Sequence, residues 1–209
     1  MTEELDLYLQ PTYYIESDSE VIRSLVDKIA GDEKDPTARA VKLFYWARDQ
    51  IRYNPFSPMM ERTDFPATTV IARGAGFCIQ KAIVLAALCR AAGIPCGLGF
   101  ADIRSHKVSP ELKALMGTDL FVYHGYNRIF LDGRWVKATC AFDIDLCQKM
   151  GFIPVEFDGK SDGVLQAVDI NGDPHIDYLR HIGDYADFPF EDFLPALKKA
   201  YGDALTRKL

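Results

Sequence analysis

The stretch Arg73-Gly74-Ala75-Gly76-Phe77-Cys78, with the apolar run of residues 79–89 behind it, is the part of the sequence that best predicts the fold. Residues 78–92 contain neither proline nor glycine and are dominated by Ala, Leu, Ile and Val, and Gly93 and Pro95 then end the run. Because the run is apolar nearly all the way round, it predicts a buried central helix. A glycine-rich turn would deliver Cys78 to the start of that helix.

Cys78 is the first candidate for chemistry. A thiol at a helix N-terminus lies near the positive end of the helix dipole, which favours the thiolate. Gly74 and Gly76 permit sharp backbone geometry before it and the close approach of a substrate. The alternative is a structural role, since free cysteine usually behaves as a small, buried and inert hydrophobe. This stretch alone leaves both interpretations open.

Composition limits the class of protein. The chain has 209 residues, 48% of them hydrophobic, which suffices for one buried core and makes a single domain over 1–209 the expectation. The formal net charge of −6 argues against a nucleic-acid-binding protein, which would carry a basic field. We expect no metal site, because Cys89, Cys96, Cys140 and Cys147 lack zinc-ligand spacing and fit core packing better.

The sequence also predicts a location. The N-terminal residues 1–5 are acidic and lack the positive and apolar regions of a secretory signal. No stretch approaches the length of a membrane span, so we expect no membrane contact. The 5 cysteines are an odd number without the spacing of a disulfide framework. These features favour a cytoplasmic protein.

The order of elements predicts an α+β fold, with helices first and an antiparallel sheet after them. Residues 13–15 fit an edge strand in an otherwise extended start, and Asp132-Gly133 is a two-residue hairpin signal. The patterns predict helices over about 18–30, 35–51, 69–74, 78–92, 110–116, 142–151 and 190–201, and strands over 96–103, 120–131 and 134–141.

A thiol enzyme needs an imidazole to handle the proton and a polar group to orient the imidazole. Of the 4 histidines, His124 lies inside the strongest predicted strand, between Tyr123 and Gly125. A lone histidine in a strand more often has a structural role. The presence of Cys78 at a helix start makes His124 the candidate partner.

The hairpin suggests where the third group lies. If Leu131 pairs with Arg134, continued pairing places His124 opposite Ala141. The diagonal neighbours of His124 are then Thr139 and Asp143, and either could accept a hydrogen bond from the imidazole. Asp143 is chemically better because a carboxylate stabilises an imidazolium. Its alternative role is to cap the following helix, a common use of aspartate.

At this point the sequence resembles the transglutaminase-like superfamily, a branch of the papain-like thiol enzymes. That family has Gly-x-Cys at the head of a helix that ends Leu-Arg-Ala-x-Gly-Ile-Pro, and here residues 76–78 and 88–95 match it. A second family block runs from a His through a strand to Leu-Asp-Gly-x-Trp, and residues 124–135 match that block. The resemblance covers about 35–145. It implies a papain-like core there, with about 151–209 as an extension packing on the same domain and bordering the cleft.

One departure concerns the third catalytic residue. The Asp of the family's Asp-Pro-Thr aligns with Thr139, and a hydroxyl orients an imidazole less strongly than a carboxylate. Some relatives carry a Thr-Pro-Ala-Phe-Asn-like string here, whose last residue would match Asp143. The resemblance therefore implies either a Cys78–His124–Asp143 triad or a weakened form that uses Thr139.

The predicted activity is acyl transfer through Cys78, with His124 as acid and base and no cofactor. The backbone N–H of Cys78 would be one oxyanion donor. A cysteine hydrolase acting on a peptide, protein or small amide is the first expectation, and an amide-forming transferase is the second. A catalytically inactive interaction module is the alternative from another class, because a shared fold does not guarantee chemistry. A redox-sensing thiol is a weaker alternative, since it would need a resolving cysteine nearby.

Overall fold

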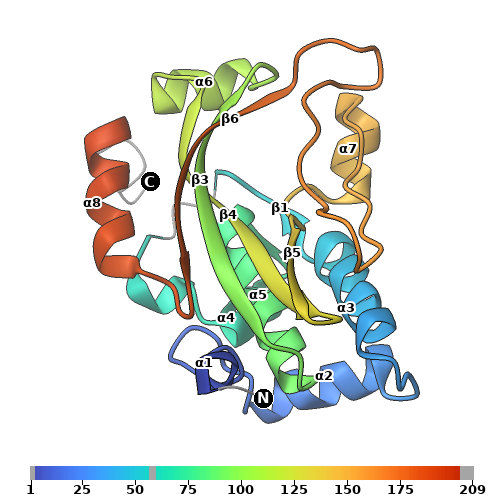
Figure 1. Cartoon of the computed structure of the whole chain (residues 1–209). Coiled ribbons are helices and arrows are strands. Elements are labelled where there is room, and N and C mark those ends of the chain that lie inside the picture. The colour runs from blue at the N-terminus through green and yellow to red at the C-terminus, as the bar shows by residue number, and fades with distance from the viewer. Residues whose placement is uncertain (1–2, 57–59, 203–209) are drawn as a thin grey trace.

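The computed structural model describes residues 3–56 and 60–202. It contains helices packed against an antiparallel sheet (Figure 1), which confirms the α+β prediction. The N-terminal half carries α1 (Glu3–Asp6), α2 (Glu20–Ala30), α3 (Pro36–Gln50), β1 (Arg52–Tyr53), a 3-10 turn (Arg62–Asp64), α4 (Ala67–Arg73), β2 (Ala75–Gly76) and α5 (Cys78–Ala91). The rest carries β3 (Cys96–Ser105), α6 (Pro110–Met116), β4 (Leu120–Leu131), β5 (Arg134–Ala138), α7 (Ile144–Met150), β6 (Ile176–Tyr185) and α8 (Phe190–Tyr201).

Helix α5 is the central element of the core, as its composition predicts. Every residue from Ile79 to Arg90 is buried, so no face of the helix is left to solvent. It contacts α2, α3 and α4 as well as strands β3 and β4, and in Figure 1 it lies behind the sheet. Burial on all sides explains why the run needs no polar stripe.

The start of α5 is held by its neighbours in sequence. Gly74 ends α4 in the left-handed conformation, at φ 66°, which glycine adopts without strain. The next two residues form β2, which pairs in parallel with β1. This pairing places Tyr53 beside Gly76, two residues before Cys78. The chain entering α5 is therefore fixed by backbone hydrogen bonds.

The main sheet has the order β5-β4-β3-β6 and is antiparallel throughout. Leu131 pairs with Arg134 across the Asp132-Gly133 turn, as the hairpin signal predicts. The returning strand is shorter than predicted, however, because β5 ends at Ala138. There Ala138 pairs with Gly163, and the N–H of Thr139 donates to the Gly163 carbonyl at 2.8 Å. The chain thus leaves β4 before it could place Ala141 opposite His124, and that prediction is wrong.

Two further differences lie near the termini. Residues 13–15 form no strand, and residues 3–6 form a short helix where extended chain was expected. The sequence analysis also missed β6, which pairs with β3 and adds a fourth strand. Its residues are mostly exposed, so the alternation that identifies a half-buried strand is absent from its sequence. Segment 176–201 thus contributes one sheet edge and α8.

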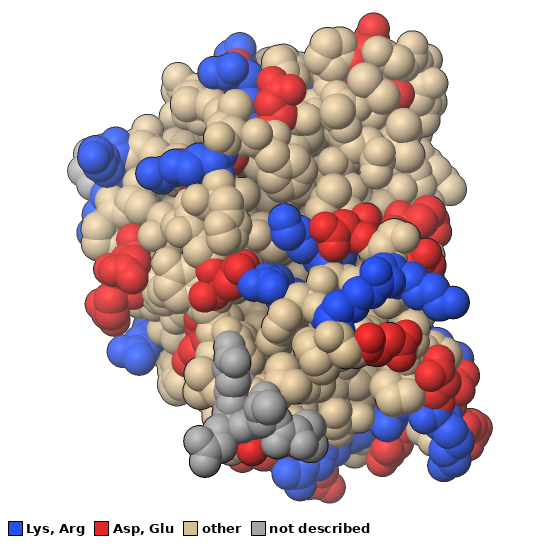
Figure 2. All heavy atoms as spheres, in the orientation of Figure 1, with Lys and Arg blue, Asp and Glu red and all other residues tan. Residues whose placement is uncertain are grey.

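No helix in the described parts of the chain is long and apolar enough to cross a membrane. All 5 cysteines are free, and only Cys78 is not fully buried. On the face shown in Figure 2, acidic and basic side chains are interspersed, and charges are sparse over the part that carries α7 in Figure 1.

Candidate active site

Cys78 is the first residue of α5, where the sequence predicts it. Three backbone N–H groups, those of Cys78, Ile79 and Gly125, point toward its sulfur. Gly125 is needed for this approach of β4 to the helix. A Cβ atom at Gly125 would lie 3.0 Å from the Cα atom of Ile79 and 3.3 Å from its nitrogen. Strand β4 therefore touches the N-terminus of α5 next to His124.

An irregular backbone precedes His124. The pairing of β3 with β4 shifts register between Ala101 and Ile103, and Tyr123 has a φ of 57°. Positive φ is uncommon for a residue other than glycine and marks local strain. The N–H of Tyr123 is satisfied by the carboxylate of Asp102 at 3.2 Å. Bulges of this kind redirect side chains beside active sites, and this one immediately precedes the predicted catalytic histidine.

Cys78 and His124 line the same two cavities, which have volumes of about 60 and 250 Å³. The structure thus brings the predicted nucleophile and imidazole to one place. Loop residues Pro55 and Phe56 border this cleft, as does Met60. Residues 57–59 of the same loop lie outside the described residues.

Burial shifts both groups toward their neutral forms. It raises the pKa of the Cys78 thiol to about 11, even though the three backbone N–H groups act in the opposite direction. Burial also lowers the pKa of His124 to about 4. In the site without substrate, burial thus favours the thiol and the neutral imidazole over an ion pair.

His124 is buried and packs against a tyrosine ring. Among the described residues its Nε2 atom has no hydrogen-bond partner, and neither has the buried Oγ1 of Thr139. The ring of Tyr178, on β6, packs edge-on against His124 with the centroids 6.2 Å apart. The Tyr178 hydroxyl accepts a hydrogen bond from the N–H of Leu165 at 3.3 Å. Burial raises the pKa of Tyr178, and the nearby Thr139 side chain acts in the opposite direction with a smaller effect.

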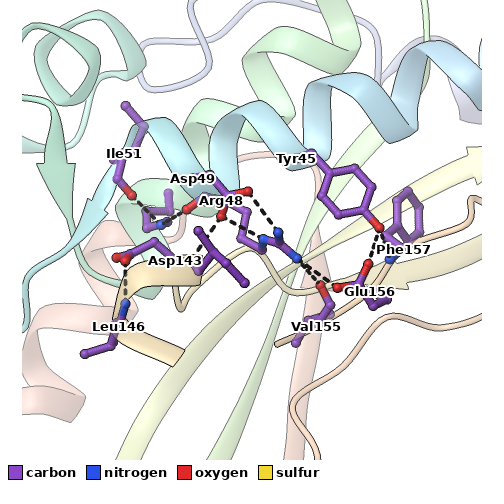
Figure 3. Close-up of polar contacts among 11 residues, drawn as sticks. Tyr45, Arg48, Asp49, Ile51, Asp143, Leu146, Val155, Glu156 and Phe157 are labelled. Atoms are coloured by element: carbon purple, nitrogen blue, oxygen red, sulfur yellow. Dashed lines mark hydrogen bonds and ion pairs between the residues drawn. The ribbon is translucent and has the colours of Figure 1, made fainter. Parts of the chain in front are cut away.

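Asp143 has the capping role that the sequence analysis left as its alternative. One carboxylate oxygen accepts from the N–H of Leu146 at 2.9 Å and caps α7 (Figure 3). The other accepts from the N–H of Tyr53 at 2.7 Å. Asp143 thus holds β1 and α7 together at the cleft. Both of its oxygens are engaged by backbone donors, and neither bonds to His124.

A buried lysine near this aspartate was missed by the sequence analysis. Lys81 is fully buried on α5, and its ammonium donates to the carbonyl of Arg48 at 2.8 Å and to that of Ile51. Burial lowers its pKa to about 8, although Asp143 acts to raise it. Lys81 therefore fastens the C-terminal end of α3 to the helix that begins with Cys78. The apolar run gave no signal for this contact.

Around the same end of α3, Arg48 bonds to the Asp49 carboxylate at 2.9 Å and to the Val155 carbonyl at 2.8 Å (Figure 3). One turn earlier in α3, the hydroxyl of Tyr45 donates to the carboxylate of Glu156. These contacts connect α3 to the chain that follows α7. They therefore fix the position of the segment around α7, which lies on the side of the sheet opposite α8 (Figure 1).

A comparison with protein-family models matches residues 23–140, more than half of the chain, to the transglutaminase-like superfamily. The chain belongs to this superfamily. The match includes Cys78, His124 and Thr139, and it ends before Asp143. It confirms the resemblance carried by the Gly-x-Cys and Leu-Asp-Gly-x-Trp blocks.

One solved structure supports the fold of this transglutaminase-like chain. A proposed cysteine protease from Cytophaga hutchinsonii superposes with a TM-score of 0.54 at 17% identity, covering 88% of this chain and 55% of its own. The chain thus spans about half the length of that protein. A proposed protease from Parabacteroides distasonis gives a TM-score of 0.42 at 15% identity, covering 65% of this chain and 25% of its own. A comparison with curated proteins gives no match.

Proposed function

We propose that this transglutaminase-like protein is a thiol-dependent acyl-transfer enzyme, and specifically a cysteine hydrolase of amide or ester bonds. The observation that carries the proposal is that Cys78, at the N-terminus of α5, and His124 line the same cavities. Membership in the superfamily supports a thiol-dependent enzyme in general. A peptide, a protein or a small amide is the proposed substrate.

In the proposed reaction His124 acts first as a base. Because burial favours the neutral thiol and the neutral imidazole, the thiol proton moves to His124 as the sulfur attacks the carbonyl. A C–S bond forms, and the imidazolium then protonates the leaving amine or alcohol as its bond to the carbonyl carbon breaks. Water, deprotonated by His124, next attacks the thioester, which releases a carboxylic acid and restores the thiol.

The N-terminus of α5 is the proposed site of oxyanion stabilisation. The N–H of Cys78 is free of any helical partner, as in the first turn of every α-helix. Backbone donors fixed in place are effective because they need no reorganisation during the reaction. Gly125, whose N–H also points toward the sulfur, would help to stabilise a developing thiolate.

Thr139 is the proposed third member of the site, in preference to Asp143. Its hydroxyl and His124 Nε2 are both buried and have no partner among the described residues, and an unsatisfied buried polar atom costs free energy. A hydrogen bond between the two would satisfy both. The two oxygens of Asp143 already accept backbone N–H groups.

The proposal is tested by trapping the acyl-enzyme. The protein is mixed with p-nitrophenyl esters, and p-nitrophenolate release is followed while mass spectrometry locates the acyl group. We expect a burst of p-nitrophenolate and an adduct on Cys78. Cys78→Ala should abolish both and His124→Ala should slow both, whereas Cys147→Ala, which removes a cysteine outside both cavities, should leave the adduct in place.

The same assay decides between hydrolysis and transfer. A hydrolase releases the free acid even when a primary amine is present, whereas a transferase diverts the acyl group into an amide. If no ester acylates Cys78, the enzyme proposal fails and the interaction-module alternative takes its place.

A further inference from the structure

The two cavities that meet at Cys78 and His124 have apolar walls. The smaller is lined by Met60, Phe77, Met116, Phe193 and Leu197 among others. The larger is lined by residues that include Phe56, Ile103, Phe142, Leu146, Met150 and Phe152. The reacting atoms therefore lie between two apolar surfaces.

Charge is nearly absent from these walls. Among the described residues, no Asp, Glu, Lys or Arg lines the smaller cavity. Lys107 is the one charged residue of the larger cavity, and its ammonium lies 3.0 Å from the Asp169 carboxylate and 3.2 Å from that of Asp173. The two carboxylates already neutralise this cation, so it is not available to a substrate anion.

Much of the apolar wall comes from outside the region that the family model matches. Helix α8 contributes Phe193 and Leu197 to the smaller cavity, and the segment after residue 140 contributes Phe142 and Phe152 to the larger one. In Figure 1, α7 and α8 lie on opposite sides of the sheet. The apolar walls are thus built jointly by the matched region and by segments outside it.

We infer that the acyl group accepted by Cys78 is bulky, apolar and uncharged, an inference that rests on the proposed acyl-transfer function. A charged acyl group would lose its hydration in these cavities and find no free opposite charge among the described residues that line them. An apolar group gains, because each fully buried methylene contributes about 0.8 kcal/mol, or roughly fourfold in affinity. A fatty acyl chain and a peptide ending in an apolar residue share this chemistry.

The test compares four p-nitrophenyl esters that differ only in the acyl group: acetyl, octanoyl, N-acetyl-leucyl and succinyl. For each, acylation of Cys78 transfers the acyl carbon from oxygen to sulfur and releases p-nitrophenolate. We expect the rate constant divided by KM to be at least about tenfold higher for an apolar acyl group than for acetyl, given partial burial of its methylenes, and lower for succinyl than for acetyl. Preference for octanoyl would indicate a lipid-like donor, and preference for N-acetyl-leucyl a peptide.

Two wall variants locate the acyl group. Met60→Glu places a charge in the smaller cavity, and Met150→Glu does so in the larger one, at a side chain that is already 40% exposed. One of them should lower the apolar-to-acetyl rate ratio at least about fivefold. Val21→Glu, at an exposed apolar position on α2 that borders neither cavity, is the matched control and should leave the ratio unchanged.

The outcomes separate the two proposals. If no ester acylates Cys78, the proposed function itself fails. If acetyl and succinyl esters react as fast as the apolar ones, or if neither wall variant changes the ratio, the enzyme stands and the inference about its acyl group is overturned.

Discussion

The ring of Tyr178 packs edge-on against the ring of His124, with an angle of 71° between their planes. Tyr178 belongs to β6, a strand outside the region matched by the family model, whereas His124 belongs to the matched core. The Tyr178 hydroxyl also lies beside Thr139, the residue that the sequence resemblance aligns with the family's aspartate. The C-terminal segment therefore supplies part of the environment of the candidate catalytic imidazole.

The first prediction concerns this contact. Tyr178→Phe keeps the ring against His124 and removes the hydroxyl beside Thr139. If that hydroxyl positions the Thr139 side chain for His124, kcat should fall about tenfold with little change in KM, a loss of roughly 1.4 kcal/mol of transition-state stabilisation. Steady-state hydrolysis of an ester substrate measures both parameters.

Tyr126→Phe is the matched control, because Tyr126 borders the same surface hollow as Tyr178 but lines neither of the cavities that contain Cys78. An equal loss of kcat in both variants would assign the effect to packing of the sheet rather than to the Tyr178 hydroxyl.

The second prediction restores a carboxylate at position 139. In Thr139→Asp a negative charge beside His124 favours the imidazolium, so the pKa of His124 should rise from about 4 toward its ordinary value. Thr139→Val, which has nearly the same shape and no hydroxyl, should leave that pKa low. The imidazole resonances of His124, followed by NMR as the pH is changed, measure the shift. An unchanged pKa in Thr139→Asp would mean that residue 139 does not reach the ring.

The third prediction concerns Asp143. Asp143→Ala removes the cap of α7, which is worth about 1 kcal/mol, and leaves the N–H of Tyr53 without its acceptor, which costs about 1–3 kcal/mol more. Asp143→Asn keeps one acceptor oxygen and should lose less. Urea unfolding measures both losses. Neither variant should change the pKa of His124, because the carboxylate bonds to Tyr53 and Leu146 instead. A fall of that pKa in Asp143→Asn would return Asp143 to the triad, because losing a carboxylate partner disfavours the imidazolium.

These residues show how far the sequence could go. The fold followed from local signals: the apolar run after Cys78 predicted a helix buried on every side, and Asp132-Gly133 predicted the register of the hairpin. Cys78 followed from its place at the start of that run, and His124 from its place inside the strongest predicted strand. Both residues line the same cavities because they lie on α5 and β4, two elements that the sequence patterns predict well.

The third residue could not be predicted in the same way, because it depended on how far β5 continues. Nothing between Lys137 and Ala141 signals that the strand ends at Ala138, where Gly163 takes over the pairing from a distant part of the chain. Tyr178 was missed for a related reason. Strand β6 is largely exposed and shows no alternation, so its pairing with β3 is visible only in three dimensions.

The last prediction concerns stability in acid. His124 and His175 are both buried, 4% and 1% exposed, and burial lowers the pKa of each to about 4, although Asp169 partly opposes this at His175. In the unfolded chain both titrate near 6.5. Between about pH 6.5 and pH 4 the unfolded state therefore binds more protons than the folded one, and the free energy of unfolding falls as the pH falls. The stability that the two neutral histidines contribute is fully present above about pH 6.5, and its loss levels off below about pH 4.

Each histidine can contribute up to about 3 kcal/mol to this loss, and urea unfolding measured at several pH values between about 7 and 4 records it. His175 stacks on Phe152 with ring centroids 4.0 Å apart, and neither ring nitrogen has a partner in the part of the chain that the structure describes. His175→Gln should therefore lower stability at neutral pH but reduce the slope of stability against pH. His181→Gln, at an exposed imidazole beside Asp184, is the matched control and should leave the slope nearly unchanged. Equal slopes in the native chain and in His175→Gln would show that His175 is protonated as readily in the folded state as in the unfolded one.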